Sequence, residues 1–307
     1  MKKVAVLMGG CSSERDISLQ SGEGVAEALV GLGYSVSRLD WSGDGAELVE
    51  MLTAERPDVV FNALHGRFGE DGCVQGLLNM MRIPYTHSGV AASAIGMDKD
   101  LTRQLAENAD IDVAAGRLMM REDFLSGGEP IMPYVIKPNA DGSSVGVFIV
   151  RDEADRERAL AAWPAGEVRL LEDYIAGREL SVAVLDGCAI GVVEIIPKSG
   201  YYDFTNKYQE GGARHVIPAE IGSEMTALAK DWAEQMHTMI GCRGVSRCDF
   251  RLNDRTNPEN PRLVLLEINT NPGMTRLSLV PELARICRQM SYAELVRHLV
   301  EEATCDN

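Results

Sequence analysis

The sequence has no long apolar run, and this absence argues against a membrane-spanning protein. None of its stretches reaches about 18 consecutive apolar residues, the length that a bilayer-spanning helix needs. Its start, Met1-Lys2-Lys3 followed at once by Val4–Met8, also lacks the apolar region and cleavage site of a secretory signal. We therefore expect a cytoplasmic protein with no membrane partner.

The chain also has no closely paired cysteines and no excess of basic residues. Its seven cysteines include no Cys-x-x-Cys pair, so we predict reduced thiols; a catalytic cysteine or a zinc site is the alternative and needs partners at metal-like spacing. The net charge is −16. Because nucleic-acid binding requires a basic surface, no nucleic-acid partner is expected, and a bound polyphosphate would need local cations.

What the sequence does contain is typical of a globular protein of more than one domain. Hydrophobic residues make up 45% of its 307 residues and charged residues 25%. Residues 1–93 alternate short apolar runs with helical periods, which predicts βαβ units around a mostly parallel sheet. Strands are expected at 4–8, 35–39 and 58–64, with a helix ending at Gly33 whose apolar stripe is Val25, Ala28, Leu29 and Leu32.

The rest of the chain favours a helix followed by antiparallel strands. One helical stretch is expected from about residue 94 to Ala109. Hairpins are predicted at 133–137 with 145–150 and at 244–251 with 262–269, strands at 170–172, 180–185 and 191–196, and helices at 222–240 and from about 291. The irregular, Gly- and Tyr-rich segment 199–213 is long enough to be a functional loop.

Polar side chains on the last predicted hairpin suggest a metal site. Asp249 lies on one strand, and Glu267 and Asn269 lie two residues apart on the next, so the latter two leave the same face. Carboxylates on rigid strands, shared with phosphate oxygens and water, are typical Mg²⁺ ligands. A solvated strand face is the alternative, but Glu267 follows the apolar run 263–266, which favours the metal site.

Two lysines and a glycine-rich loop suggest a phosphate site. Lys137 ends the apolar run 133–136 and comes shortly before Asp141-Gly-Ser-Ser-Val-Gly146, whose glycines let backbone amides approach a phosphate. The loop matches neither GxxxxGK[ST] nor GxGxxG, and a plain turn is the alternative. With Lys99 and the metal hairpin, the parts needed to neutralise a triphosphate are present.

Glu172 and Glu179 flank a segment that could read a nucleotide. They bracket Asp173–Arg178 after a predicted strand, where backbone groups could contact an adenine edge and Glu179 a ribose hydroxyl. Surface helix caps explain such glutamates equally well.

Taken in order, these segments resemble the ATP-grasp superfamily and, within it, the D-alanine–D-alanine ligase family of bacterial cell-wall synthesis. The resemblance runs nearly end to end. It rests on 9–14 (GGCSSE), 65–72 (HGRFGEDG), 97–99 (MDK), Lys137-Pro138, 142–146 (GSSVG), 202–208 (YDFTNKY), 247–249 (RCD), 267–274 (EINTNPGM) and Ser278-Leu279.

The resemblance implies an α/β protein with an ATP-grasp fold and an N-terminal doubly wound parallel sheet. Its expected parts are a substrate-binding domain at 1–93, a central ATP-grasp subdomain with the phosphate-covering loop at 94–175, and a C-terminal subdomain at 176–307. The implied reaction joins two D-alanine molecules through D-alanyl phosphate, for peptidoglycan precursor synthesis. A homodimer is expected by the same resemblance.

Site roles also follow from the resemblance. ATP would be held by Lys99, Lys137, Ser144, Glu172 and Glu179, and two Mg²⁺ ions, with Mn²⁺ as a substitute, by Asp249, Glu267 and Asn269. Glu14 would bind the ammonium of the first D-alanine, with His65 nearby. Ser143 and Tyr208 would form a hydrogen-bonded link to Glu14 that orders the closing loop. Arg247 and Gly273 would stabilise the tetrahedral intermediate, and the second carboxylate would meet Lys207, Ser278 and Leu279.

Several alternatives accompany this hypothesis. A lone loop histidine such as His65 is often only a satisfied polar residue, and Tyr208 could pack in the core. D-Serine or D-lactate could be the second substrate, although ester-forming relatives lack the pair Lys207-Tyr208. An ATP-grasp carboxylase or purine-pathway ligase would not share the first ninety residues, and an ATP-binding regulatory protein would lack the full catalytic set. Two departures from the family pattern are His87, where glycine is common, and 139–141, which lack the usual charge.

Overall fold

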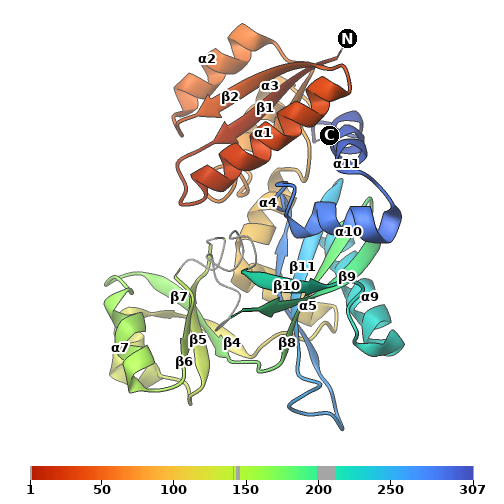
Figure 1. The fold of residues 1–307 in the computed structure, drawn as a ribbon. Coiled ribbons are helices and arrows are strands. Elements are labelled where there is room, and N and C mark those ends of the chain that lie inside the picture. The colour runs from red at the N-terminus through yellow and green to blue at the C-terminus, as the bar shows by residue number, and fades with distance from the viewer. Residues whose placement is uncertain (1, 141, 143–145, 199–211, 307) are drawn as a thin grey trace.

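The computed structural model describes residues 2–140, 142, 146–198 and 212–306. Its first sheet is parallel, with strand order β2-β1-β3. These strands are β1 (Lys3–Gly9), β2 (Ser35–Trp41) and β3 (Val59–Asn62). Tyr85 extends the sheet through a parallel bridge to Val60 and an antiparallel bridge to Thr304. The last described residues of the chain therefore return to the first sheet (Figure 1).

Helices cover both faces of this sheet, which confirms the predicted doubly wound arrangement. Val4 and Val6 pack with α1 (Arg15–Gly31), whereas Ala5 and Leu7 share the opposite core with side chains of α2 (Gly45–Glu55) and α3 (Cys73–Met81). Alternate strand residues point to opposite faces, so a strand that is buried throughout needs a cover on each side. Leu32 caps α1, and Gly33 follows at φ +86°, as the sequence predicts.

The single helical stretch predicted from about residue 94 is wrong in its continuity. The chain forms two helices, α4 (Val90–Met97) and α5 (Lys99–Asn108), separated at Asp98. Asp98 is extended (φ −84°, ψ 102°), and its carboxylate accepts a hydrogen bond of 2.9 Å from the Leu101 N–H. Aspartate is a strong N-cap residue because it satisfies such helix-start donors. The break places Lys99 at the first position of α5.

The second sheet is antiparallel, with order β4-β7-β5-β6. Its strands are β4 (Gly116–Met120), β5 (Tyr134–Pro138), β6 (Phe148–Val150) and β7 (Val168–Asp173). One face packs on α7 (Glu153–Ala161) and the short turns α6 (Arg121–Asp123) and η1 (Phe124–Gly128) through a core that includes Phe124, Tyr134 and Trp163. The pairing of β5 with β6 confirms the first predicted hairpin.

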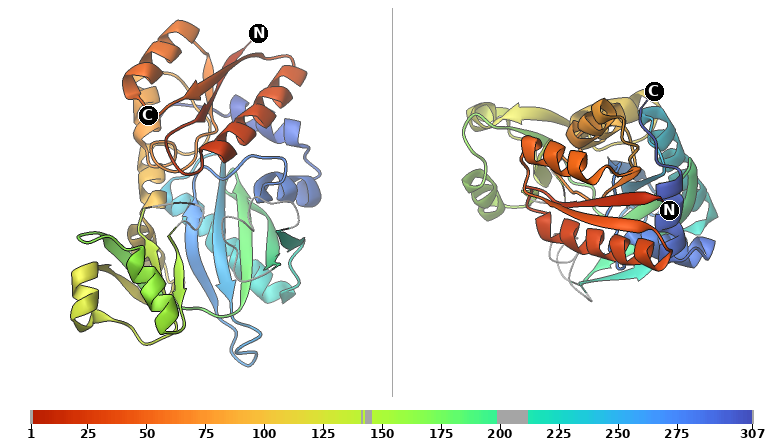
Figure 2. Two further views of the ribbon diagram at one scale, coloured as in Figure 1. Left: turned by 60° about the vertical axis from the view of Figure 1, so that its left-hand side comes forward. Right: turned by 90° about the horizontal axis from the view of Figure 1, so that it is seen from above.

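The third sheet is also antiparallel, with order β10-β9-β8-β11-β12. Its strands are β8 (Arg178–Leu185), β9 (Cys188–Pro197), β10 (Ala213–Val216), β11 (Val245–Leu252) and β12 (Leu263–Asn269). The helix α9 (Gly222–Ile240) packs on one face, and α10 (Leu279–Arg288) packs on the other with α11 (Tyr292–Glu301) beside it. Figure 2 shows α10 and α11 close to the first sheet, where all three contribute to one core.

A β-bulge in β12 decides which side chains face the second sheet. Asp249 pairs with Glu267 and Phe250 with Leu265, so Leu266 has no partner on β11. Leu263 and Leu265 lie in the core under α9, and strict alternation would send Glu267 and Asn269 there too. Because the bulge shifts the alternation by one residue, Ile268 takes the core position and Glu267 faces outward into a pocket.

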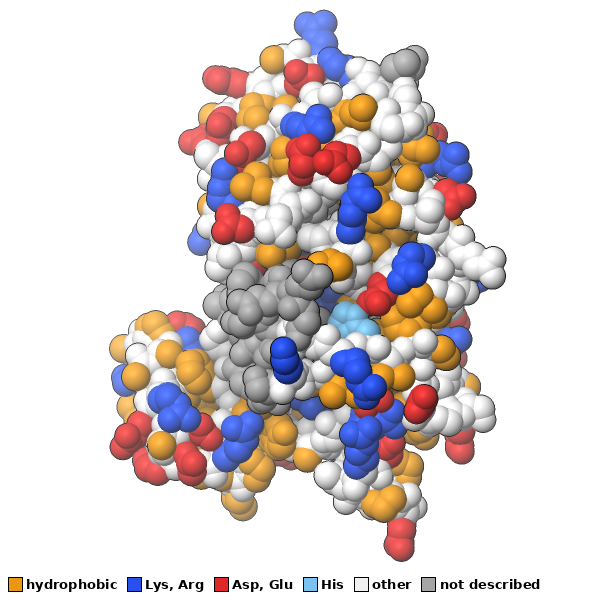
Figure 3. Space-filling view, viewed as in Figure 1, with side chains coloured by type: hydrophobic (Ala, Val, Ile, Leu, Met, Phe, Trp, Pro, Cys, Tyr) orange, Lys and Arg blue, Asp and Glu red, His pale blue; other side chains and the backbone are white. Residues whose placement is uncertain are grey.

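The absences predicted from the sequence can be checked over the described residues. All seven cysteines are free, as predicted. No helix in the described ranges is long and apolar enough to cross a membrane. On the face shown in Figure 3, acidic and basic side chains are interspersed.

Candidate active site

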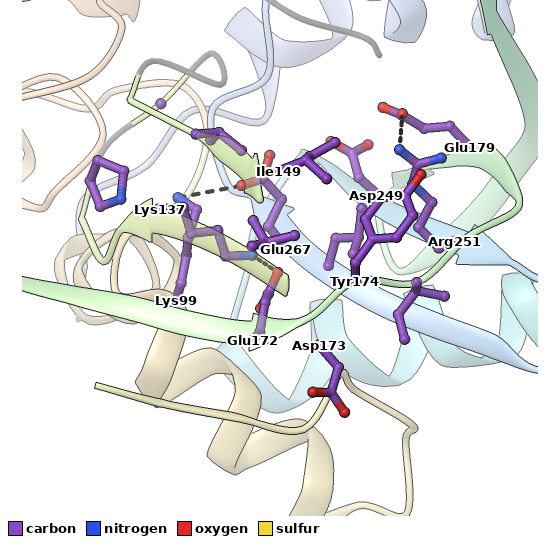
Figure 4. A pocket seen from close by; sticks show the side chains of 16 residues that line it. Lys99, Lys137, Ile149, Glu172, Asp173, Tyr174, Glu179, Asp249, Arg251 and Glu267 are labelled. Carbon is purple, nitrogen blue, oxygen red and sulfur yellow. Dashed lines mark ion pairs between the residues drawn. The ribbon is translucent and has the colours of Figure 1, made fainter. Parts of the chain in front are cut away.

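A pocket lies between the second and third sheets. It is lined from one side by side chains of β5, β6 and β7 and from the other by side chains of β8, β11 and β12, with Lys99 of α5 at its edge (Figure 4). The sequence-predicted residues that line it are Lys99, Lys137, Glu172, Glu179, Asp249 and Glu267. Five strands and one helix, from four stretches of sequence, therefore deliver charged side chains to one space.

Two lysine–glutamate pairs occupy the same end of the pocket in Figure 4. Lys137 Nζ lies 2.6 Å from Glu172 Oε1, and both side chains are buried. Lys99 Nζ lies 3.4 Å from Glu267 Oε2. Each lysine therefore has an anionic partner in the pocket, as a cation with little access to solvent requires. A polyphosphate would be another such partner.

Glu172 and Glu179 are not helix caps, the alternative that the sequence left open. Glu172 lies on β7 and Glu179 on β8, and each forms an ion pair with a cation of the pocket, Lys137 and Arg251 respectively. Both glutamates therefore belong to the pocket wall.

Asp249 accepts hydrogen bonds from three side chains. Arg247 donates to both of its oxygens at 2.8 and 2.7 Å, the Ser181 hydroxyl donates at 2.5 Å, and the Asn269 amide at 3.3 Å. A bidentate guanidinium fixes the plane of a carboxylate. Asp249 is thus an oriented, buried acid rather than part of a solvated strand face.

The donor set around Asp249 fits a hard cation. Two carboxylates and an amide oxygen stand on neighbouring strands, with Asp249 directly opposite Glu267. Over the described residues, no group of three His, Cys, Asp or Glu side chains is close enough to hold a metal by itself. Two carboxylates fit Mg²⁺ by their chemistry, because this ion takes one or two protein carboxylates and completes its shell with phosphate oxygens and water.

A second cluster lies where the first sheet meets the third. Glu14 begins α1, and Ser12 joins it to the His65 loop by accepting from the Glu14 N–H (3.2 Å) and donating to the His65 carbonyl (2.7 Å). A Cβ built on Gly66 or Gly142 would lie 3.1 or 2.6 Å from Glu14 Oε2. The carboxylate therefore lies against the backbone of two separate loops, and a side chain at position 142 would displace the end of Glu14.

His65 is buried and held from two sides. Its Nδ1 lies 3.0 Å from Glu70 Oε1, and its Nε2 lies 3.4 Å from the Ser21 hydroxyl. Burial by itself would lower the pKa of His65, but the hydrogen bond and charge of Glu70, helped by the charge of Glu14, raise it above its usual value. The site therefore favours a protonated imidazole beside Glu14.

The start of α10 completes this region. Ser278 is the N-cap residue and Leu279 the first residue of α10, and a Cβ on Gly273 would lie 3.1 Å from the Ser278 hydroxyl oxygen. Asn271 donates to the carbonyl of Leu64 at 2.8 Å, which ties the preceding segment to the residue before His65. A helix N-terminus attracts anions because its first amides are unsatisfied and its dipole is positive there.

Comparison with known proteins assigns the family. The model of the D-ala D-ala ligase C-terminus matches residues 120–301, and that of the N-terminus matches residues 37–88. The chain is 53% identical to a D-alanine–D-alanine ligase of Paramagnetospirillum magneticum and 51% identical to one of Parvibaculum lavamentivorans. These alignments cover 99% of this chain and 99% and 98% of the relatives. The chain belongs to the D-alanine–D-alanine ligase family.

The fold of the ligase family agrees with the architecture described above. The crystal structure of D-alanine–D-alanine ligase from Bacillus anthracis complexed with ATP superposes with a TM-score of 0.81 at 27% identity. The match covers 98% of this chain and 96% of that one. The predicted ATP-grasp fold is thereby confirmed.

Four residues to which the ligase resemblance gives a role lie outside the described residues. They are Ser143 and Ser144 of the glycine-rich loop, and Lys207 and Tyr208 of the 199–211 segment. Their roles stay predictions.

Other contributors to the ligase site were given no role from the sequence. Asn139, a departure from the family pattern, accepts from the N–H groups of Lys99 (backbone carbonyl, 3.1 Å) and Asp100 (side chain, 2.9 Å), and its amide donates to Asp98 at 2.9 Å. It thereby ties β5 to the start of α5 and so to Lys99. Ser181 and Glu70 likewise orient Asp249 and His65, and Arg251 lines the pocket. No sequence signal identified these residues, because each one's partner is distant in the sequence or belongs to no recognisable pattern.

The other departure, His87, stands where glycine is common in the ligase family and has a backbone conformation that favours glycine. Its φ is +69°, in the left-handed region that glycine favours. The ring is buried edge-on against Phe61, with centroids 5.3 Å apart, and neither ring nitrogen has a hydrogen-bond partner. Burial, with a smaller effect of the charge of His65, lowers the pKa of His87 to about 3.

Proposed function

We propose that this chain joins two molecules of D-alanine at the expense of ATP, through D-alanyl phosphate, to give D-alanyl-D-alanine, ADP and phosphate for peptidoglycan synthesis. The observation that carries the proposal is the meeting of Lys99, Lys137, Asp249 and Glu267 in one pocket of a ligase-family chain. A carboxylate resists attack by an amine until its oxygen becomes a leaving group, and transfer of the γ-phosphoryl group supplies one.

The lysine end of the pocket suits the triphosphate. Lys99 and Lys137 would contact phosphate oxygens in place of, or in addition to, their glutamate partners. Ser144 and its loop would cover the phosphates. Positive charge fixed in a partly dry site stabilises the negative charge that grows during phosphoryl transfer more strongly than water does. Glu172, beside Lys137, and Glu179, at the other end, would both contact the nucleotide.

Asp249, Glu267 and Asn269 would hold magnesium, as two ions, with Mn²⁺ accepted in their place. Bound there, the metal would neutralise phosphate oxygens and orient the transferred group. Arg247 holds the Asp249 carboxylate in one plane, so the pocket presents that ligand already oriented. The same guanidinium and the Gly273 amide would stabilise the tetrahedral intermediate of amide formation.

The amino acids would bind beside the pocket. Glu14 would receive the ammonium of the first D-alanine with His65 beside it, and Ser143 and Tyr208 would link Glu14 to the covering loops. Ser278, Leu279 and Lys207 would bind the carboxylate of the second D-alanine at the start of α10. Holding acyl phosphate and amine together contributes up to roughly 7–11 kcal/mol by proximity.

Three organisational features belong to the same proposal. The strands support a division at 1–93, 94–175 and 176–307, because each range contains the strands of one sheet. A homodimer and a cytoplasmic location are what a peptidoglycan-precursor ligase of this family implies.

The test offers one acceptor at a time. Purified chain with Mg-ATP and D-alanine, L-alanine, D-serine or D-lactate is assayed for phosphate release, and products are identified by mass spectrometry. We expect D-alanyl-D-alanine and D-alanine-dependent phosphate release. Turnover that ignores D-alanine but proceeds with another acid contradicts the proposal. A second set of reactions pairs D-alanine with D-serine or with D-lactate, and a mixed product there would point to the related second-substrate activity.

A further inference from the structure

A cation lies at the end of the pocket opposite the two lysines. Arg251 of β11 stands directly across from Glu179 of β8 in the strand register. Its Nη2 lies 3.3 Å from Glu179 Oε2, and its Nη1 donates to the Gly177 carbonyl at 3.1 Å. Figure 4 shows this pair on the far side of the pocket from Lys137 and Glu172. One guanidinium thus contacts both the backbone before β8 and the carboxylate on it.

The backbone at Gly177 leaves no room for a side chain. Its φ is +141°, and a Cβ there would lie 2.1 Å from the Leu252 carbonyl oxygen. The chain entering β8 is therefore pressed against the end of β11. Tyr174 and Ile175, just upstream, line the same pocket. Through its contacts with Gly177 and Glu179, Arg251 holds the start of β8 against β11.

The geometry of the pair suits it to orient the carboxylate of Glu179. The side chains of Arg251 and Glu179 are only 16% and 14% exposed, and breaking a mostly buried pair can be costly, so stability alone does not separate a structural from an orienting role. A planar guanidinium, however, restricts the direction of a carboxylate more than a lysine ammonium does. An oriented carboxylate is what selective acceptance from one sugar hydroxyl requires.

We propose that Arg251 is a positioning residue that aims Glu179 at a ribose hydroxyl and so makes the pocket discriminate ribonucleotides from deoxyribonucleotides. The inference rests on the proposed function, in that the pocket is taken to bind ATP with its phosphates at the lysine end.

The experiment measures binding of ATP, 2′-deoxy-ATP and 3′-deoxy-ATP with Mg²⁺ by calorimetry, without D-alanine. The parent chain should bind ATP roughly tenfold more tightly than the analogue lacking the hydroxyl that Glu179 accepts, the value of one hydrogen bond to a charged group. Arg251→Met should bring this ratio close to one, and Arg251→Lys should restore part of it. In turnover, the KM for ATP should rise while kcat and the KM for D-alanine stay close to the parent values.

Two controls separate positioning from a general structural role. Arg262→Met removes a guanidinium on the same hairpin that pairs with Asp112 at 2.9 Å outside the pocket, and it should leave the ratio unchanged. In a Glu179→Ala background, Arg251→Met should change the ratio no further, because coupled residues are not additive.

Two results would overturn the inference. One is an unchanged ratio in a folded Arg251→Met chain, and the other is an equal loss of affinity for all three nucleotides. Failure of the ligase proposal looks different: ATP binding and its dependence on Arg251 persist, but D-alanine causes no phosphate release.

Discussion

The proposed nucleotide pocket and the proposed amino-acid site are built in different ways. Most of the pocket's charged side chains stand on paired strands, and their partners stand on neighbouring strands or at the start of α5. Glu14 and His65 lie instead at a helix start and in a loop, and neighbouring loop residues hold them. A strand keeps its geometry when one side chain changes. A loop site depends on each of its hydrogen bonds, so it should be more sensitive to its supporting residues.

The largest effect is expected in the pocket, where one ligand can be removed without harm to the fold. Glu267→Gln removes a carboxylate that would bind magnesium and faces Lys99. We expect kcat to fall by roughly 10²–10³, the loss typical for one strong transition-state contact, with little change in the thermal midpoint. Phosphate release is measured over a Mg²⁺ titration. Glu259→Gln, on the exposed β11–β12 turn, is the control, and full turnover of Glu267→Gln at saturating Mg²⁺ would refute the metal role.

The loop site should respond to a residue that contacts no substrate. In Glu70→Gln one oxygen can still accept from His65, but the charge that raises the His65 pKa and the acceptor for the Gly66 N–H (3.0 Å) are lost. Because its pKa is raised, His65 keeps its proton at pH values where a free histidine has already lost it. The stabilisation of the folded state by this proton is complete at lower pH and is lost as pH rises through the folded pKa. The alkaline limb of the kcat/KM profile should therefore move to lower pH, with a measurable loss of kcat/KM near neutrality.

A matched control exists elsewhere on the surface. Asp186→Asn changes the carboxylate partner of His298, 2.6 Å away, and should leave the profile unchanged. If Glu70→Gln behaves like this control, the loop site does not depend on its support.

A smaller effect should appear as acid sensitivity at His87. The unfolded chain takes up a proton near pH 6.5, whereas the buried ring resists it until about pH 3, so stability falls as pH drops between these values. The native state should lose about 2 kcal/mol between pH 7 and pH 5 from this residue alone. His87→Asn, which tolerates a left-handed backbone, should flatten that loss in denaturant titrations at both pH values. An equally steep loss in the variant would contradict this.

The smallest effect is expected at the joint between the first sheet and α4. Asp306 accepts from the Val90 N–H at 2.9 Å and lies 3.1 Å from Arg243, so it caps α4 from the far end of the chain. Asp306→Ala should cost about 0.5–2 kcal/mol, the usual value of an N-cap, and lower the thermal midpoint by a few degrees. Activity at room temperature should be unchanged. Asp58→Ala, which removes a side-chain acceptor for the Lys3 N–H, is the comparison.

The stabilisation by Asp306 depends on pH with the opposite sign to that by His65. Burial opposes ionisation of Asp306, but the Val90 amide, Asn79 and Arg243 lower its pKa below the usual value. The stabilisation is therefore present at neutral pH and lost as pH falls through the folded pKa. The difference between parent and variant should shrink in acid.

The sequence predicted the strand-borne part of the site better than the rest, for a physical reason. The spacing of Glu267 and Asn269 suffices to place both on one face, and a strand holds that relation regardless of its surroundings. The contact of Gly142 with Glu14 joins residues from different sheets, and nothing in either segment specifies it. Likewise, Arg251 gains a partner only when β8 pairs with β11.

Some errors had usable signals. Asp98 is a good N-cap residue directly before a polar helical run, and reading it so would have divided the helix expected from residue 94. The bulge at Leu266 had none, because its sequence reads as an uninterrupted apolar run.

That unpaired leucine acts as a frame shift within one strand. Before Leu266, the odd-numbered residues Leu263 and Leu265 face the hydrophobic core, and after it the odd-numbered Glu267 faces the pocket. The two parts of the strand can therefore change in composition independently. Excising Leu266 would leave Leu265 and Glu267 adjacent and still pointing to opposite sides, the directions they already have. A single-residue deletion, normally ruinous inside a sheet, would at this one position preserve the orientation of every remaining side chain.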